Sequence, residues 1–316
     1  MSFDVVILGG GVSGTMMAKR LELTFPQLHT VVIDRKDVSI HPFHIHRPID
    51  LPGLNKLKPA ILKTNVWDGV SFKGKPTLRD VNQYSLKLFG FLQVSNLNNM
   101  EDQTIYPVTK SDLLHLLSSK ATQMEGVVTG VNLQEKKILC DSGVAVPYRY
   151  LVNTLPLPTF LKMANLTPRF AIESHPFWTM AIDLLGTGMY QMIYNCDSEC
   201  AITRTTLLGD TLFVEAMDSC LREKDLEYLV DLYHLSPERI GFLKEIRPGR
   251  LKLLSQEDRK PLLHYLTERW DVFCLGRFGA WTYKIANSVW DDTAFLCDLM
   301  YAKEQAVKYQ QDEVIA

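Results

Sequence analysis

The N-terminal stretch of this chain contains the pattern that most restricts its fold: a strand, a glycine-rich turn, a helix, and a second strand that ends in an acid. Phe3–Leu8 is a short apolar run rich in β-branched residues, which predicts a buried parallel strand. Gly9–Gly14 follows with the spacing G-x-G-x-x-G, and Thr15–Phe25 predicts a helix. Thr30–Ile33 predicts a second strand, which leads into Asp34. This order is typical of a dinucleotide-binding βαβ unit.

Each part of this pattern has a physical role in holding a dinucleotide. Gly9 permits the tight turn, Gly11 lets the backbone approach a pyrophosphate, and Gly14 allows the helix to pack closely on the strand. The helix N-terminus offers free N–H groups and the positive end of its dipole to phosphates. Asp34 would accept hydrogen bonds from a ribose and repel a 2′-phosphate, which disfavours NADP. The alternative is a glycine-rich turn in some other α/β protein.

The composition excludes several other classes of protein. The 316 residues suggest two domains or one large domain, and 46% hydrophobic with 22% charged residues is ordinary for a globular chain. A formal net charge of -2 provides no overall basic footprint for nucleic acid. No apolar run is long enough for a membrane span, and we expect no secretory signal, because the first apolar run leads directly into glycines without a basic segment before it. The six scattered cysteines indicate reduced thiols, so we expect a cytoplasmic protein.

The alternation of strands and helices breaks after the second strand, which indicates an interrupted dinucleotide domain. Ser39–Pro59 is irregular and rich in His and Pro. Paired strands are predicted further along at Val127–Leu133 and Lys137–Asp141, followed by a buried strand at Tyr150–Thr154. Another apolar strand is predicted at Trp270–Leu275. We infer that the dinucleotide domain resumes in these later segments.

At these residues the chain resembles the glutathione-reductase-type flavoproteins of the amine oxidase, protoporphyrinogen oxidase and UDP-galactopyranose mutase group. Val5–Arg35 is similar to the N-terminal FAD motif of that group, and Tyr150–Pro158 is similar to its strand and T-x-P-x-P element near the flavin. Leu275–Tyr283 is similar to a strand end with the pattern GRxGxxxY. A weaker match is Ile202–Arg204, which is similar to a substrate-proximal Thr-Arg strand of the mutases.

The resemblance implies FAD as the cofactor. Asp34 and Arg35 would lie at the adenosine ribose, and Val128 near the adenine. Arg277 would approach the phosphates or the ribityl chain, and Asn287–Asp292 would place backbone N–H groups near the flavin N1–C2=O edge. The cofactor-binding residues implied in this way are Gly9, Gly11, Val12, Ser13, Gly14, Asp34, Arg35, Val128, Thr154, Gly276, Arg277, Asn287, Ser288 and Val289.

Other side chains are candidates for the chemistry itself. His44 is a candidate acid or base in a loop near the flavin and His46 a candidate flavin contact, with a solvated surface loop as the alternative for each. No nearby carboxylate or cysteine completes a metal-ligand set there, so we expect no metal. Arg204 lies in a predicted hairpin and would face either an anionic substrate or solvent. Trp281 and Tyr283 alternate on a predicted extended segment and would stack on flavin or substrate, or pack in the core.

We therefore predict an α/β protein with a Rossmann-like FAD-binding domain, whose parallel sheet carries a β-meander, and a smaller mixed α+β substrate domain. The flavin ring would lie between the two domains. The discontinuous FAD-binding domain is expected to comprise residues 1–45, 105–160 and 265–316. The substrate domain is expected to comprise residues 46–104 and 161–264.

The resemblance implies an FAD-dependent oxidoreductase, similar to amine or amino-acid oxidases, in which a hydride passes from a substrate C–H bond to flavin N5. Two alternatives stay open: a flavin-dependent sugar isomerase similar to UDP-galactopyranose mutase, and a non-catalytic FAD-binding subunit. The expected partner is a substrate, either a small molecule or a group attached to a macromolecule, and Arg204 favours an anionic one. We expect no membrane or nucleic-acid partner, and an oligomer is compatible with the sequence.

Overall fold

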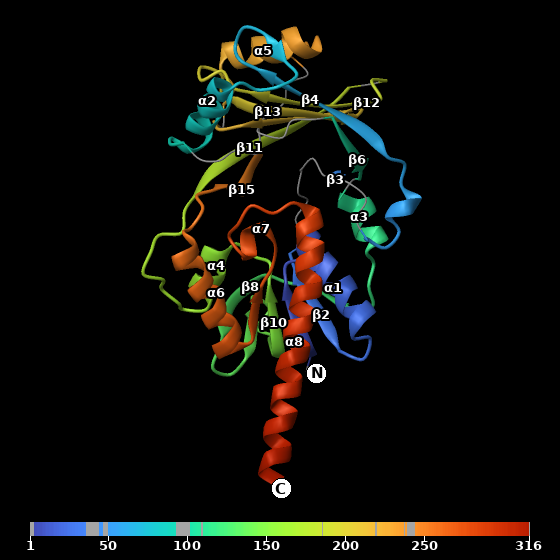
Figure 1. Ribbon diagram of the computed structural model, residues 1–316, viewed down its shortest axis with the longest axis vertical. Helices are drawn as coiled ribbons and strands as arrows, with labels where there is room; N and C mark the ends of the chain where they lie inside the picture. The colour runs from blue at the N-terminus through green and yellow to red at the C-terminus, as the bar shows by residue number, and fades with distance from the viewer. Residues whose placement is uncertain are drawn as a thin grey trace.

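The two sheets of this protein are stacked along its long axis. The computed structural model describes residues 3–35, 44–46, 50–92, 102–108, 110–184, 186–218, 220–236, 238 and 244–315. Within these residues the chain forms one sheet of seven strands and one of nine. Figure 1 shows the seven-stranded sheet between layers of helices, with the nine-stranded sheet beyond it. No helix in the described ranges is long and apolar enough to cross a membrane.

The seven-stranded sheet contains the predicted parallel core. In spatial order its strands are β7 (Thr122–Glu125), β2 (Thr30–Asp34), β1 (Phe3–Leu8), β10 (Ala145–Asn153), β9 (Lys137–Cys140) and β8 (Val128–Asn132), with β16 (Val272–Cys274) also paired to β10. The pairs β7–β2, β2–β1, β1–β10 and β10–β16 are parallel. Strands β8, β9 and β10 form an antiparallel meander. The predicted parallel sheet with a β-meander is thus confirmed.

Helices cover both faces of this sheet. Val5 and Ile7 of β1 pack on the side of α1 (Val12–Thr24) and α8 (Ala286–Ile315). Val6 and Leu8 pack on the opposite side, toward α4 (Leu157–Met163) and α6 (Gln256–Trp270). All four side chains are fully buried, which explains why the strand is uninterruptedly apolar from Val5 onward. A further helix, α3 (Lys110–Leu116), contacts α1.

The nine-stranded sheet is mixed. In spatial order its strands are β15 (Lys244–Leu251), β11 (Ser174–Asp183), β14 (Thr211–Ala216), β13 (Ile202–Gly209), β12 (Met189–Asn195), β4 (Ala60–Trp67), β6 (Gln103–Pro107) and β3 (His44–His46), with β5 (Phe72–Lys73) paired to β4. The predicted hairpin is the pair β13–β14. Strands β3 and β6 pair in this sheet, although their residues fall largely in segments assigned to the FAD-binding domain from the sequence.

Two helices lie on opposite faces of the nine-stranded sheet, and different side chains meet each of them. Helix α5 (Glu223–Tyr233) covers the face turned away from the seven-stranded sheet (Figure 1), where the hydroxyls of Thr205 and Tyr233 are 2.6 Å apart. Helix α2 (Leu78–Phe89) packs on the other face, and its Tyr84 ring meets Tyr194 edge to face at 5.5 Å. Because side chains alternate along a strand, Arg204 points to the α2 side. A short 3-10 helix, Leu54–Lys56, precedes β4.

Candidate functional site

The carboxyl ends of three parallel strands meet at one edge of the seven-stranded sheet. The register places Leu8 of β1 beside Asn153 of β10, and Asn153 beside Cys274 of β16. The Thr154 hydroxyl donates a 2.6 Å hydrogen bond to the Leu8 carbonyl, which ties two of these strand ends together. Ligands of open α/β sheets bind at such an edge. We call the turns that follow these strands, Gly9–Gly14, Thr154 and Gly276, the cradle.

Glycine is required sterically at several positions of the cradle. Gly9 has a φ of +97°, and a Cβ at Gly14 would lie 1.9 Å from the Gly9 carbonyl oxygen. Gly276 has a φ of +80°, and a Cβ there would lie 2.2 Å from the Ser13 hydroxyl oxygen. The turn after β16 therefore packs directly against the first turn of α1. Gly11 differs, because a Cβ there would meet nothing within 4 Å, so this position faces open space.

The cradle fits the adenosine diphosphate part of a dinucleotide. Helix α1 begins after Gly11 without a side-chain cap and without an acidic residue in its first turn, so its terminal N–H groups are available to an anion. The Asp34 carboxylate lies against the turn, 2.8 Å from where a Cβ of Gly10 would be. Gly126 N–H donates to the Asp34 carbonyl at 3.1 Å, which brings the start of β8 at Val128 toward the same end. The cradle thus combines the positive end of the α1 dipole, open space at Gly11 and the Asp34 carboxylate.

A second group of polar residues lies between the two sheets and includes three arginines, which we call the arginine cluster. Arg204 comes from β13, Arg250 from the end of β15, and Arg277 from α7 (Gly276–Gly279). Arg204 forms an ion pair with Glu215. Burial alone would lower the pKa of Arg204, but the Glu215 charge outweighs it and raises that pKa above its usual value. Burial and the charges of Arg250 and Arg204 lower the pKa of Arg277 to about 10.

Tyrosine rings surround the arginine cluster. The Arg204 guanidinium lies 5.9 Å from the ring of Tyr194, and the Arg277 guanidinium lies 5.0 Å from the ring of Tyr283. The Tyr283 hydroxyl donates to the Leu251 carbonyl at 3.1 Å, which joins the segment after α7 to β15. Burial raises the pKa of Tyr84, although the charges of Arg250 and Arg204 oppose this effect. Tyr84 therefore stays a neutral phenol that can donate a hydrogen bond.

The arginine cluster carries buried donors that none of the described residues satisfies. Among the described residues, the Nε and Nη2 atoms of Arg250 and the Nε atom of Arg277 are buried and have no hydrogen-bond partner. Buried donors normally have partners, and a buried charge without one is costly. Three guanidinium groups and the Glu215 carboxylate leave a net charge of about +2. The arrangement is suited to an anionic ligand.

Arg250 was not identified from the sequence. It lies near the end of a stretch, Lys244–Leu251, in which no periodicity or motif distinguished it from a solvated basic residue. Its position depends on the pairing of β15 with β11, where Arg250 is opposite His175, and its guanidinium lies 4.6 Å from the ring of Phe177. Only the tertiary structure brings it to Arg204 and Arg277.

The structure does not place Trp281 and Tyr283 on the common face that the sequence predicts. Trp281 lies in the core of the seven-stranded side, and its indole N–H donates to the Lys252 carbonyl at 3.0 Å, so we place it outside the arginine cluster. The sequence predicts an extended segment for these two residues, but the backbone there forms turns. The Ala280 N–H bonds to the Gly276 carbonyl and the Thr282 N–H to the Arg277 carbonyl, and Trp281 has a φ of +49°.

The segments predicted to approach the flavin ring lie at the junction of the two sheets. Asn287 and Ser288 are half-buried in the first turn of α8, and Val289 is buried in the core against α1. Helix α8 also contacts strand β3, which contains His44 and His46. The side chains of both histidines lie outside the described part of the structure. Arg35 is exposed after β2, next to Asp34.

No protein-family model matches the sequence, and no curated protein matches it. A reduced UDP-galactopyranose mutase superposes with a TM-score of 0.66 over 92% of this chain and 92% of its own, at 14% sequence identity. The chain has the fold of this mutase.

Other solved structures share the same fold. A protein from Exiguobacterium sp. named as a protoporphyrinogen oxidase superposes with a TM-score of 0.59, 10% identity, and coverage of 92% of this chain and 98% of its own. A flavin-dependent halogenase from Xanthomonas campestris gives a TM-score of 0.53, 9% identity, and coverage of 100% and 77%. The predicted resemblance to this group is confirmed for the fold. At these identities, cofactor and reaction must be argued from the residues.

Proposed function

We propose that the protein is an FAD-dependent enzyme that binds the cofactor along the cradle and acts on an anionic substrate at the arginine cluster. One observation carries the proposal. Gly276 packs on Ser13 at the start of α1, and the next residue, Arg277, belongs to the arginine cluster. The cofactor cradle and the arginine cluster are therefore joined within two consecutive residues. A cofactor that starts at the cradle and extends toward the cluster would bring its reactive end to the substrate.

The residues of the cradle would bind the cofactor by the physical means already described. The free N–H groups of α1 would receive the pyrophosphate at the open Gly11 position. The Asp34 carboxylate would accept hydrogen bonds from the ribose hydroxyls. The half-buried first turn of α8, with Asn287 and Ser288, would offer N–H groups to the flavin. When bound, the flavin supplies the redox chemistry, so the favoured reaction class is oxidation of a substrate C–H bond.

The arginine cluster would bind and orient the substrate. Arg250 and Arg277 have buried donors available, whereas the charge of Arg204 is compensated by Glu215. The described side chains here are guanidinium groups, phenols and a paired carboxylate, so their role is to position an anion and exclude water rather than to transfer protons at neutral pH.

A flavin-dependent isomerase is the second candidate. It is favoured by the superposition on UDP-galactopyranose mutase, which covers 92% of both chains. It is also favoured by the net positive charge of the arginine cluster, which suits a substrate with phosphate groups. The two candidates share the cradle and the cluster and differ only in whether the substrate is oxidised overall.

The spectrum of the purified protein tests the proposal. We expect visible flavin absorbance and release of FAD on denaturation. Loss of the absorbance on adding an anionic substrate without oxygen would support the oxidoreductase, whereas turnover only after reduction with dithionite would support the isomerase. A colourless protein that takes up no FAD when the coenzyme is supplied in excess would falsify the proposal.

A further inference from the structure

A separate cavity lies on the opposite side of the nine-stranded sheet from the arginine cluster. It has a volume of about 250 Å³ and opens between the β4–β5 turn, the loop after β12, and helix α5. This volume corresponds to roughly eight water molecules at about 30 Å³ each, which admits a small molecule but no folded segment. The residues that line it are Trp67, Gly69, Phe72, Asp197, Cys200, Lys224, Glu227, Tyr228, Asp231 and Leu232.

Three aromatic rings form one part of the cavity wall. The centroids of Trp67 and Phe72 are 4.7 Å apart with planes inclined at 45°, and those of Trp67 and Tyr228 are 6.4 Å apart at 47°. Phe72 is 49% exposed and lines the cavity, so part of its ring is accessible to a ligand there. The faces of aromatic rings attract cations through their quadrupoles, and inclined rings can surround one.

The opposite wall is acidic. Helix α5 presents Lys224, Glu227 and Asp231 on one face, because they are spaced by three and four residues. Lys224 is compensated by Asp197 at 3.4 Å and Glu199 at 2.6 Å. Neither Glu227 nor Asp231 forms an ion pair within the part of the chain that the structure describes. Two like charges at i and i+4 repel each other, and a cation between them and the rings would relieve this repulsion.

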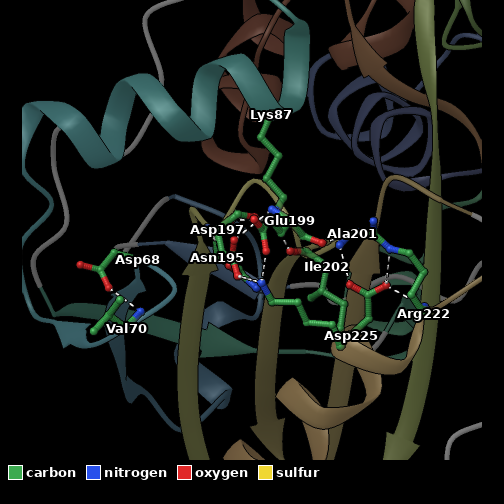
Figure 2. A network of polar contacts seen from close by, with 11 residues as sticks. Asp68, Val70, Lys87, Asn195, Asp197, Glu199, Ala201, Ile202, Arg222 and Asp225 are labelled. Atoms are coloured by element: carbon green, nitrogen blue, oxygen red, sulfur yellow. Dashed lines mark hydrogen bonds and ion pairs between the residues drawn. The ribbon is translucent and has the colours of Figure 1, made fainter.

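The walls of the cavity are held in place by a hydrogen-bond network (Figure 2). Asp68 accepts the N–H groups of Val70 at 2.9 Å and Ser71 at 2.7 Å, which fixes the turn after Trp67. Asp225 of α5 accepts the Ala201 N–H at 2.6 Å, which fixes the other loop to the helix. These hydrogen bonds hold the cavity walls in position, which lowers the entropic cost of binding a ligand.

Lys87 of α2 supports the same loop from the other face of the sheet. Its ammonium donates to the carbonyl oxygens of Asn195 at 3.0 Å, Asp197 at 2.8 Å and Ile202 at 2.7 Å (Figure 2). Burial lowers the pKa of Lys87 to about 8, so at neutral pH it keeps the three N–H donors that these carbonyls require. Asp197, which lines the cavity, is therefore held through its backbone carbonyl by Lys87 and through its carboxylate by the Glu199 N–H at 2.9 Å.

We propose that this cavity binds a small organic ammonium ion. Its cationic head would lie against the rings of Trp67, Phe72 and Tyr228 and face the carboxylates of Glu227 and Asp231. This site has the opposite charge preference to the arginine cluster and lies across the sheet from it, so one chain would bind an anion on one face and a cation on the other. The inference does not depend on the proposed function.

Calorimetric titration of the full-length protein with choline, as a probe cation, tests the proposal. We expect one class of sites for choline and binding at least about tenfold weaker for 3,3-dimethylbutan-1-ol, which has the same shape without the charge. Trp67→Ala should weaken choline binding about tenfold, and the double variant Glu227→Gln with Asp231→Asn should do the same. Glu223→Gln removes an acid from the same helix outside the cavity and should leave binding unchanged.

Three results would overturn the proposal: no saturable heat with choline, equal binding of the neutral alcohol, or unchanged choline binding in the double variant. If Trp67→Ala fails to fold, the double variant decides, because both of its carboxylates are exposed and unpaired within the described chain. Flavin content should be the same in all these proteins, since none of the substituted residues belongs to the cradle.

Discussion

Arg204 and Glu215 are neighbours on adjacent antiparallel strands and form an ion pair across β13 and β14. The Glu215 carboxylate is only 2% exposed, so this pair is enclosed in the sheet. Because of this ion pair, Arg204 differs from the other two arginines of the cluster. Arg204 is compensated by Glu215, whereas Arg250 and Arg277 have buried donors without a partner in the part of the chain that the structure describes. The three arginines should therefore respond differently to substitution.

Arg250→Met should weaken the binding of an anionic probe such as UDP by about 10- to 100-fold, because a charge-assisted hydrogen bond to the ligand is lost. The variant should be as stable as the parent protein or more so, since two buried guanidinium nitrogens that have no partner among the described residues are removed. Calorimetric titration with UDP and thermal unfolding of the same preparations measure the two effects.

Arg204→Met is the matched comparison and should reduce stability instead. The substitution removes the guanidinium that forms an ion pair with the buried Glu215 carboxylate, which costs about 3–5 kcal/mol of unfolding free energy. The assignment of roles would be contradicted if Arg250→Met destabilised the protein as much as Arg204→Met, or if it bound UDP normally.

Gly11→Ala and Gly14→Ala should separate cofactor binding from folding. A Cβ at Gly11 meets nothing within 4 Å, so the variant should fold with a stability change within about 1 kcal/mol but fill the space proposed for the pyrophosphate. We expect FAD affinity to fall by about tenfold or more. A Cβ at Gly14 would lie 1.9 Å from the Gly9 carbonyl oxygen, so that variant should lose about 3 kcal/mol of stability. Flavin absorbance per chain and urea unfolding distinguish them.

Asp271 should contribute to stability in a pH-dependent way. It bridges Lys136 at 2.6 Å and Lys303 at 2.8 Å, and joins the turn after β8 to helix α8. Burial alone would raise the pKa of Asp271, but the hydrogen bonds from the two lysines outweigh it and hold that pKa below its usual value of 3.8. The folded protein therefore binds fewer protons than the unfolded chain near this pH, so this stabilisation is present above about pH 4 and lost as the pH falls further.

Asp271→Asn should lower the free energy of unfolding by about 1–2 kcal/mol at neutral pH. Asparagine tolerates the left-handed backbone of this position, where φ is +54°, so the substitution removes mainly the charge. The difference from the parent protein should shrink as the pH falls below about 4. Chemical unfolding at several pH values measures it, and a constant difference down to acidic pH would argue against the ion pairs as its cause.

Lys87→Met should destabilise the loop after β12, because three carbonyl oxygens lose their donor. We expect a loss of about 2–4 kcal/mol. Lys75→Met removes an exposed lysine from the segment just before α2 and should change stability by no more than about 0.5 kcal/mol. Urea unfolding of both variants checks this, and equal stabilities would show that the three hydrogen bonds contribute little.

The cradle could be predicted from the sequence because it depends on contacts between residues close in the chain. The spacing of Gly9, Gly11 and Gly14 after an apolar strand corresponds to sterically required turn positions, apart from the open one at Gly11. The helix begins at Val12 rather than Thr15, a small shift of the kind expected at helix ends. The conformation of Trp281 could not be predicted from the alternating pattern of residues. Its left-handed backbone follows from the turn at Gly276, which that pattern does not reveal.

The sequence by itself determined the first strand–helix–strand unit, the glycine turn and the acid at Asp34, and the strands that later complete the parallel sheet, since hydrophobic periodicity and backbone sterics act over short stretches of chain. The tertiary structure alone decided which arginines meet. Arg204, Arg250 and Arg277 are brought together by the register of β13, of β15 and of the turn after β16. Which charges become paired and which stay available depends on this long-range packing, because burial and Coulomb energy are set by neighbours distant in the chain.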